Sequence, residues 1–129
     1  MKEIDQLLKE ALAGESLANR KYIAFSAQAE KDGYSQVSRL FKAAAEAEAV
    51  RASNHLKAAK GVKTTKENLL EAIAGETHEF KEMYPSMIEK SKLEGDKNAE
   101  RTLSYANEVE KVHAKLYRDI LDNLETSKE

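Results

Sequence analysis

Four stretches of this sequence repeat apolar residues every three or four positions, which is the spacing of one face of an α-helix. The repeats are interrupted at Asp32-Gly33, at Gly61 and at Gly95-Asp96, where glycine favours a turn. The pattern predicts four helices: Lys2–Lys31, Ser35–Lys60, a third that opens at Thr64 and a fourth that follows Asp96 and runs to about Leu124. Residues 126–129 are predicted to be a frayed tail.

The third predicted helix carries two local signals. Thr64 followed three residues later by Glu67 matches a capping box, which marks the start of a helix. Pro85 falls in the helix interior. Because proline has no N–H to donate, one backbone hydrogen bond should be lost there and the helix should kink.

Polar residues interrupt each apolar stripe at positions that should be buried: Glu15, Glu48, Glu76, Glu79, Glu110 and His113. Burying a carboxylate is costly unless it is paired or binds a metal. Glu110 and His113 are three residues apart, so they share one face of the fourth helix. Two-metal carboxylate proteins place a Glu-x-x-His pair opposite glutamates from neighbouring helices. The pattern therefore predicts a metal site inside a helical bundle.

The two halves of the sequence repeat each other. Residues 10–16 (EALAGES) return as residues 71–77 (EAIAGET), with five identities in seven and a shift of 61, while Gly33 returns as Gly95 with a shift of 62. Two helical hairpins related by duplication explain this repeat. Residues equidistant from the turn of an antiparallel hairpin lie opposite each other. This predicts that Glu15 faces Glu48, and that residues 76 and 79 face residues 110 and 113.

Composition narrows the class of protein. The chain has 129 residues, one proline and five glycines, and is rich in Ala, Glu, Lys and Leu, which predicts a single all-α domain over residues 1–129. The net charge of −2, with both signs interspersed, does not favour nucleic-acid binding. Without cysteine the chain holds no disulfide and no rubredoxin-like iron centre. We see neither a signal peptide nor a membrane-spanning run, and expect a cytoplasmic protein.

Motifs around these polar residues closely resemble the rubrerythrin family, in order and spacing over nearly the whole chain. They are Gly14-Glu15-Ser16, Glu48-Ala49-Val50-Arg51, Gly75-Glu76-Thr77-His78-Glu79, Met83-Tyr84-Pro85 and Glu110-Lys111-Val112-His113. The resemblance implies a ferritin-like four-helix bundle with a non-haem di-iron centre, without the rubredoxin domain that many members carry.

The resemblance also implies a set of ligands for two metals. Glu48 and Glu110 resemble the carboxylates that bridge the two metals. Glu15 and Glu79 resemble ligands of the first metal, and Glu76 and His113 resemble ligands of the second. Tyr22 and Tyr84 resemble tyrosines that hydrogen-bond ligand carboxylates, with the alternative that they are ordinary core aromatics.

The family resemblance implies a function in oxidative stress. It implies two iron ions, with an oxo or hydroxo bridge when oxidised, and manganese or zinc as alternatives. The leading hypothesis is a peroxidase that reduces hydrogen peroxide with electrons from an external carrier such as a rubredoxin-like protein. A second hypothesis is a ferroxidase or iron-handling protein that uses dioxygen or peroxide. A third is a metal-poor structural bundle in which Arg51 replaces a metal.

Arg51 departs from both the family pattern and the internal repeat, which place a histidine there. A guanidinium stays protonated and cannot bind a metal. Either carboxylates alone hold the first metal, or that position is weakened, or Arg51 binds a carboxylate bidentately in place of the metal. His55 lies one turn beyond Arg51, too far from Glu48 along the helix to replace the missing ligand, and is interpreted as a supporting or buried histidine.

The linker between the two hairpins, Gly61–Lys63, is short. Two-metal bundles usually relate their hairpins by a two-fold axis, which makes the second and third helices parallel. A helix of roughly 25 residues is about 38 Å long, whereas four or five linker residues reach only about 17 Å. A homodimer that exchanges hairpins between chains is therefore favoured. An up-down-up-down monomer is the alternative.

Overall fold

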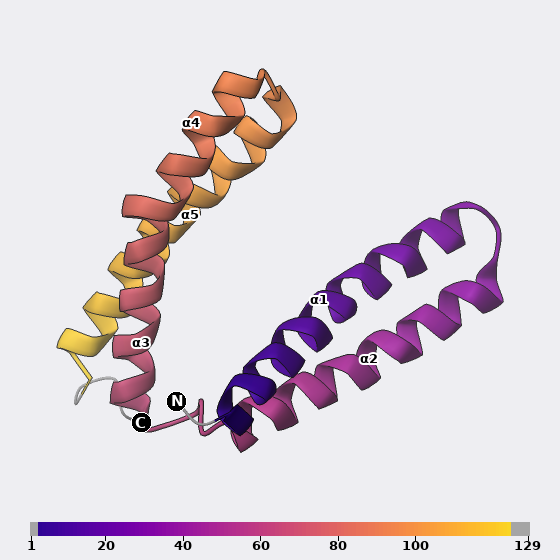
Figure 1. Cartoon of the computed structure of the whole chain (residues 1–129), viewed down its shortest axis with the longest axis horizontal. Coiled ribbons are helices and arrows are strands. Elements are labelled where there is room, and N and C mark those ends of the chain that lie inside the picture. Colours follow the sequence, from indigo (N-terminus) through magenta and orange to yellow (C-terminus); the bar gives the residue numbers. More distant parts are fainter. Residues whose placement is uncertain (1–2, 125–129) are drawn as a thin grey trace. The chain divides into compact units, whose positions relative to one another are not determined.

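The computed structural model describes residues 3–124, and within them the regular structure is α-helix with one π-helical segment and no strand. The all-α prediction is therefore confirmed, and the predicted tail at 126–129 lies outside the described residues. The chain forms two compact units with their boundary between Val62 and Lys63. Each unit is a helical hairpin (Figure 1). No helix within residues 3–124 combines the length and apolar character needed to span a membrane.

The first hairpin pairs α1 (Glu3–Lys31) with α2 (Ser35–Ala58). Gly33 in the turn has a φ of 90°, a left-handed conformation that glycine adopts without a steric penalty. Ser26 and Ser38 are buried near this turn, and the Ser26 hydroxyl donates to the Ser38 carbonyl oxygen at 2.8 Å. The two hydroxyl oxygens lie 3.0 Å apart. These small side chains let the helices approach closely and satisfy each other's polar groups.

Further from the turn, aromatic rings and an amide join α1 to α2. The rings of Tyr22, Phe25 and Phe41 form a cluster with centroid separations of 5.4 to 6.2 Å. Such tilted and edge-on pairs add to the stabilisation from apolar burial. The Asn19 side-chain amide donates to the Ala45 carbonyl at 2.8 Å, and Ala45 is 2% exposed.

The second hairpin contains α3 (Thr65–His78), η1 (Glu79–Met83), α4 (Tyr84–Glu94) and α5 (Lys97–Asp122). The predicted cap of its first helix is confirmed, since the Thr64 hydroxyl accepts a hydrogen bond from the Glu67 N–H at 3.2 Å. At the turn before α5, the Asp96 carboxylate accepts from the Ala99 N–H at 2.9 Å. Gly95 has a φ of 72° and ends α4 in the left-handed conformation.

A π-helical segment, η1, occupies the place where the sequence predicted only a kink. The Tyr84 N–H donates to the Glu79 carbonyl, five residues back. Pro85 follows directly and cannot donate to the Lys81 carbonyl in the α-helical pattern, so the wider turn lies where that pattern is already interrupted. Figure 1 shows α3, η1 and α4 as one continuous ribbon that changes direction along its length.

The internal repeat contains the signal for η1. Before this segment the repeat shift is 61, as from Glu15 to Glu76, and after it the shift is 62, as from Tyr22 to Tyr84. A π-helical segment accommodates one extra residue within a continuous helix. The one-residue change in shift is therefore explained by η1.

We expect Ser26→Ala to lower the free energy of unfolding by about 1 kcal/mol, because the buried Ser38 hydroxyl loses its partner. Ser53→Ala is the matched control in the same hairpin, since Ser53 is exposed and its hydroxyl makes no hydrogen bond within residues 3–124. Urea denaturation followed by circular dichroism at fixed metal content measures both changes. Equal midpoints for the two variants would contradict a stabilising role for the Ser26–Ser38 contact.

Candidate metal centre

The second hairpin brings three of the predicted metal ligands together. Potential donor atoms of Glu76 in α3 and of Glu110 and His113 in α5 all lie within 4.8 Å of one another. The Nδ1 atom of His113 is 3.3 Å from Oε1 of Glu76. The turn-based alignment of residues 76 and 110 thus agrees with the structure.

One oxygen of Glu76 is buried and lacks a partner. Its Oε2 atom makes no hydrogen bond among the described residues, although the carboxylate side chain is only 18% exposed. An unsatisfied buried carboxylate oxygen costs more than a neutral one, so this atom calls for a donor or a cation. Carboxylate oxygens with an imidazole nitrogen suit iron, manganese or zinc. The residues present therefore fit the metal that the sequence predicts.

The π segment adds Glu79 to this group. Its pKa is raised, chiefly because its carboxyl shares a hydrogen bond with Glu110, and further because burial and the negative charge of Glu110 disfavour ionisation. The positive charge of His78 acts in the opposite direction. Glu79 and Glu110 are therefore in contact, and their mutual repulsion is what a bound cation would relieve.

Tyr84 follows the π segment and lies beside the same carboxylates. Burial raises the pKa of its hydroxyl, and the negative charges of Glu79 and Glu110 raise it further. The hydroxyl therefore keeps its proton at neutral pH and is available as a hydrogen-bond donor. Because Glu79 opens η1 and Tyr84 comes directly after it, the π segment places both residues.

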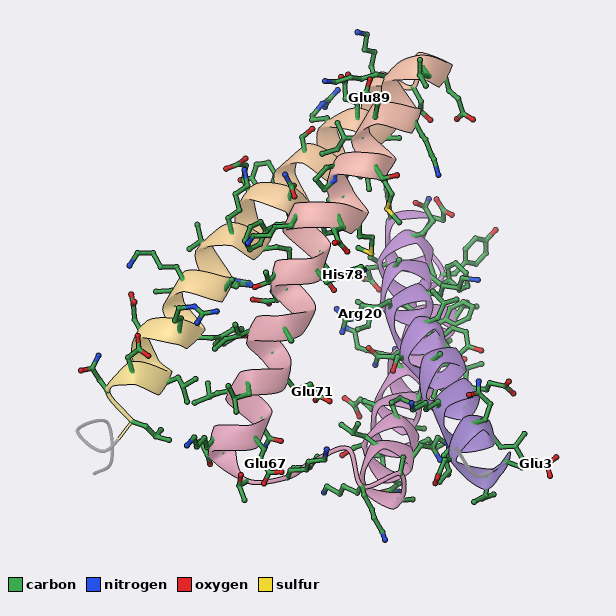
Figure 2. The ribbon with its side chains drawn as sticks, turned by 60° about the vertical axis from the view of Figure 1, so that its left-hand side comes forward. Glu3, Arg20, Glu67, Glu71, His78 and Glu89 are labelled. Atoms are coloured by element: carbon green, nitrogen blue, oxygen red, sulfur yellow. The ribbon has the colours of Figure 1, made fainter. Side chains whose placement is uncertain are left out.

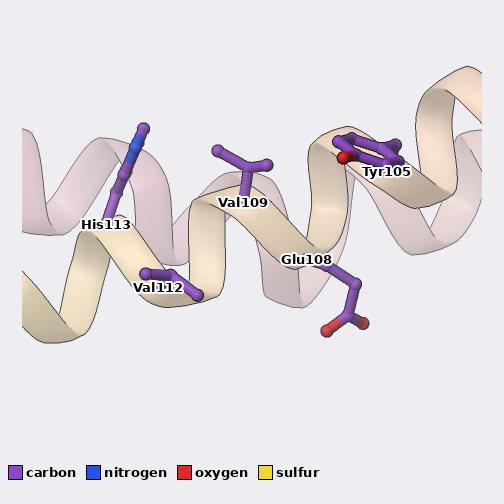
Figure 3. A pocket seen from close by; sticks show the side chains of 5 residues that line it. All are labelled: Tyr105, Glu108, Val109, Val112 and His113. Carbon is purple, nitrogen blue, oxygen red and sulfur yellow. The ribbon is translucent and has the colours of Figure 1, made fainter.

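Apolar side chains of α5 share a cavity with the imidazole. Tyr105, Val109 and Val112 line this cavity of about 390 Å³ together with Glu108 and His113. Figure 3 shows Val109 and His113 on one side of the helix and the Glu108 carboxylate on the other. The His113 side chain is 44% exposed in this hairpin.

In the first hairpin, Glu48 is paired with Arg51 on the same helix. One guanidinium nitrogen, Nη1, lies 3.0 Å from Oε1 of Glu48, and the Arg51 side chain is 60% exposed. The contact therefore uses a single pair of atoms, which differs from the bidentate arrangement considered for this arginine. An exposed ion pair of this kind contributes at most about 1 kcal/mol.

Glu15, the other candidate ligand of this hairpin, lies next to His55. The distance from Nε2 of His55 to Oε1 of Glu15 is 3.8 Å, and both side chains are half-buried. Sequence reasoning compared His55 only with Glu48 on its own helix and missed the neighbour on the facing helix. The direction in which side chains lean along a helix could have predicted this contact. Side chains lean toward the N-terminus of their helix, which brings the Glu15 carboxylate toward the level of His55.

The other predicted or considered residues occupy plainer surroundings. Tyr22 belongs to the aromatic cluster, and no hydrogen bond joins its hydroxyl to a carboxylate within residues 3–124. His78 forms an exposed pair with Glu82 at 2.8 Å. Figure 2 shows His78 projecting from α3 away from α5.

Comparison with known proteins decides the family. The sequence model of the rubrerythrin family matches residues 6–121. The chain belongs to the rubrerythrin family. Rubrerythrin-2 of Clostridium acetobutylicum is 38% identical over 136 residues, which cover 95% of this chain and 74% of the relative. Rubrerythrin-1 of the same organism is 33% identical over 144 residues, with 98% and 73% covered.

Nigerythrin of Nitratidesulfovibrio vulgaris is 35% identical over 124 residues, which cover 85% of this chain and 61% of the relative. A solved structure of nigerythrin in its fully reduced, all-ferrous state aligns with 97% of this chain and 69% of its own chain at 30% identity and a TM-score of 0.48. The family match assigns the chain to the ferritin-like four-helix-bundle fold of rubrerythrins, as predicted.

We expect Glu110→Gln to weaken binding of a divalent metal to the second hairpin by about 10-fold or more, because it removes a charged donor from the cluster with Glu76 and His113. Glu108→Gln is the matched control on the same helix, since Glu108 pairs with Lys111 at 3.0 Å and is 72% exposed. Calorimetric titration with Mn²⁺ measures both affinities. Equal losses in the two variants would show that the charge of the helix, and not the cluster, governs binding.

Proposed function

We propose that this protein is a non-haem di-iron peroxidase that reduces hydrogen peroxide to water with electrons from a separate carrier. The observation that carries the proposal is the cluster of Glu76, Glu110 and His113, with its unpaired buried oxygen, in a chain of the rubrerythrin family. Carboxylates and an imidazole arranged in this way are suited to hold redox-active iron.

The proposed ligand set draws on both hairpins, of one chain or of two. Glu48 and Glu110 are the proposed bridging ligands. Glu15 and Glu79 are the proposed ligands of the first metal, and Glu76 and His113 are those of the second. Iron held by these residues would supply the electrons that reduce the O–O bond. The homodimer that exchanges hairpins stays a prediction from the length of the linker.

Two of the proposed ligands and a neighbouring tyrosine stabilise a changing charge at the proposed site. A hydrogen bond with Glu110 and burial raise the pKa of the Glu79 carboxyl, so Glu79 takes up a proton more readily than an ordinary glutamate. The Tyr84 hydroxyl keeps its proton and can donate to either carboxylate, which restricts their movement. Each peroxide takes up two electrons and two protons and yields two molecules of water.

The electrons must come from a redox group outside these 129 residues. The sequence contains no cysteine, so it cannot itself hold a rubredoxin-type iron. A rubredoxin-like protein is the proposed carrier. Such a carrier would supply the electrons that the site needs between turnovers.

We expect protein loaded with Fe²⁺ without oxygen to contain close to two iron ions per chain, and one peroxide to oxidise both. Elemental analysis and stopped-flow absorbance measure these quantities, and reduced rubredoxin should restore the ferrous state repeatedly. Glu110→Gln is the negative control for turnover. Iron that is oxidised once and then accumulates would indicate a ferroxidase. A folded protein that binds no iron would indicate a structural bundle.

We expect Arg51→His to raise affinity at the first metal position and to speed peroxide reduction, because an imidazole replaces a cation that cannot bind metal. Arg51→Gln is the control, since it removes the charge without adding a ligand of comparable strength. Elemental analysis and single-turnover kinetics compare the three proteins. Unchanged metal content and rate in Arg51→His would show that Arg51 does not limit the chemistry.

A further inference from the structure

His55 is the one histidine of the first hairpin, and it faces a glutamate that the proposed function assigns to the first metal. Its Nε2 atom lies 3.8 Å from Oε1 of Glu15, across the interface between α2 and α1. The side chains are 30% and 25% exposed, so both are partly shielded from water. Within residues 3–124, no other polar side chain forms a hydrogen bond or ion pair with Glu15.

The separation is slightly longer than a hydrogen bond, which requires about 2.7–3.2 Å between nitrogen and oxygen. A side-chain movement of under about 1 Å closes that gap. The tautomer with its proton on Nε2 would then donate to Glu15. A carboxylate whose one oxygen accepts such a bond presents its other oxygen in a restricted direction, and ligand carboxylates in metal sites are held in this way.

The internal repeat also places the residue at this position next to a candidate metal ligand. His55 corresponds to Tyr117 with a shift of 62. In the second hairpin the Tyr117 ring lies beside the ring of His113, with centroids 6.2 Å apart. In each hairpin, therefore, the residue at this position neighbours a candidate metal ligand, which is Glu15 on the facing helix in the first hairpin and His113 on the same helix in the second.

The neighbouring Arg51 explains why the first hairpin needs this support. The second hairpin has an imidazole beside its first glutamate, since His113 contacts Glu76 at 3.3 Å. In the first hairpin the equivalent position is Arg51, which turns to Glu48 instead. Without His55, Glu15 would have no polar side chain to fix its orientation.

We propose that His55 is a positioning residue that donates from Nε2 to the Glu15 carboxylate and holds it ready for the first metal. This inference rests on the proposed two-metal function. His55 acts through Glu15 and is not itself a metal ligand. It therefore supplies by hydrogen bonding part of the order that an imidazole ligand at position 51 would otherwise provide.

Titration of the full chain with Mn²⁺, followed by calorimetry and by elemental analysis after desalting, tests this role. We expect His55→Leu to weaken the first metal position by about 10-fold or more and to leave the second unchanged. His55→Gln should retain most of the affinity, because its amide can still donate, whereas the shorter His55→Asn should not reach Glu15. Asn54→Leu is the matched control, since it places the same apolar side chain at an exposed neighbouring position of α2.

The outcomes separate this inference from the proposed function. Wild-type protein that binds no Mn²⁺ would overturn both. Two sites of unchanged affinity in His55→Leu would overturn the positioning role alone. A loss in His55→Gln as large as in His55→Leu would also overturn it, because a donating amide would then not replace the imidazole. If His55→Leu fails to fold by circular dichroism, His55→Asn gives the same comparison without an apolar substitution.

Discussion

Repulsion between carboxylates held in contact is the constraint on which the second hairpin depends. Donor atoms of Glu76 and Glu110 lie within 4.8 Å of each other, and a hydrogen bond with Glu110 raises the pKa of Glu79. One imidazole and one protonated tyrosine lie nearby, which cannot balance the charge of three ionised carboxylates. In the proposed function, a cation from solution relieves this repulsion. The first hairpin carries its own cation, because Arg51 neutralises Glu48.

Sequence periodicity and glycine positions predicted much of this structure. The helix pattern, the cap at Thr64 and the level of Glu76 with Glu110 all follow from local spacing and the position of one turn. The Ser26–Ser38 and Asn19–Ala45 contacts could not be predicted, because they depend on how closely two helices approach. The sequence places residues at levels along a helix, but it does not set the distance between helices.

Other features were missed although signals for them exist. The contact of His55 with Glu15 depends on the lean of side chains toward the helix N-terminus, which comparison of residues on one helix does not capture. The π segment was hidden in the change of repeat shift from 61 to 62. In both cases the residues were identified, but the direction in which their side chains point from the helix was not considered.

The π segment has a consequence for the history of the chain. Inserting one residue into an α-helix rotates everything beyond it by about 100°, which would turn Tyr84 and the rest of α4 away from α5. Absorbing the residue within a single wide turn confined the change to η1. With the shift of 61 that holds before η1, Glu79 corresponds to Ala18 of the first hairpin. A duplicated pair of hairpins could therefore become unequal, with a new carboxylate on one side, while the rest of the helix kept its alignment.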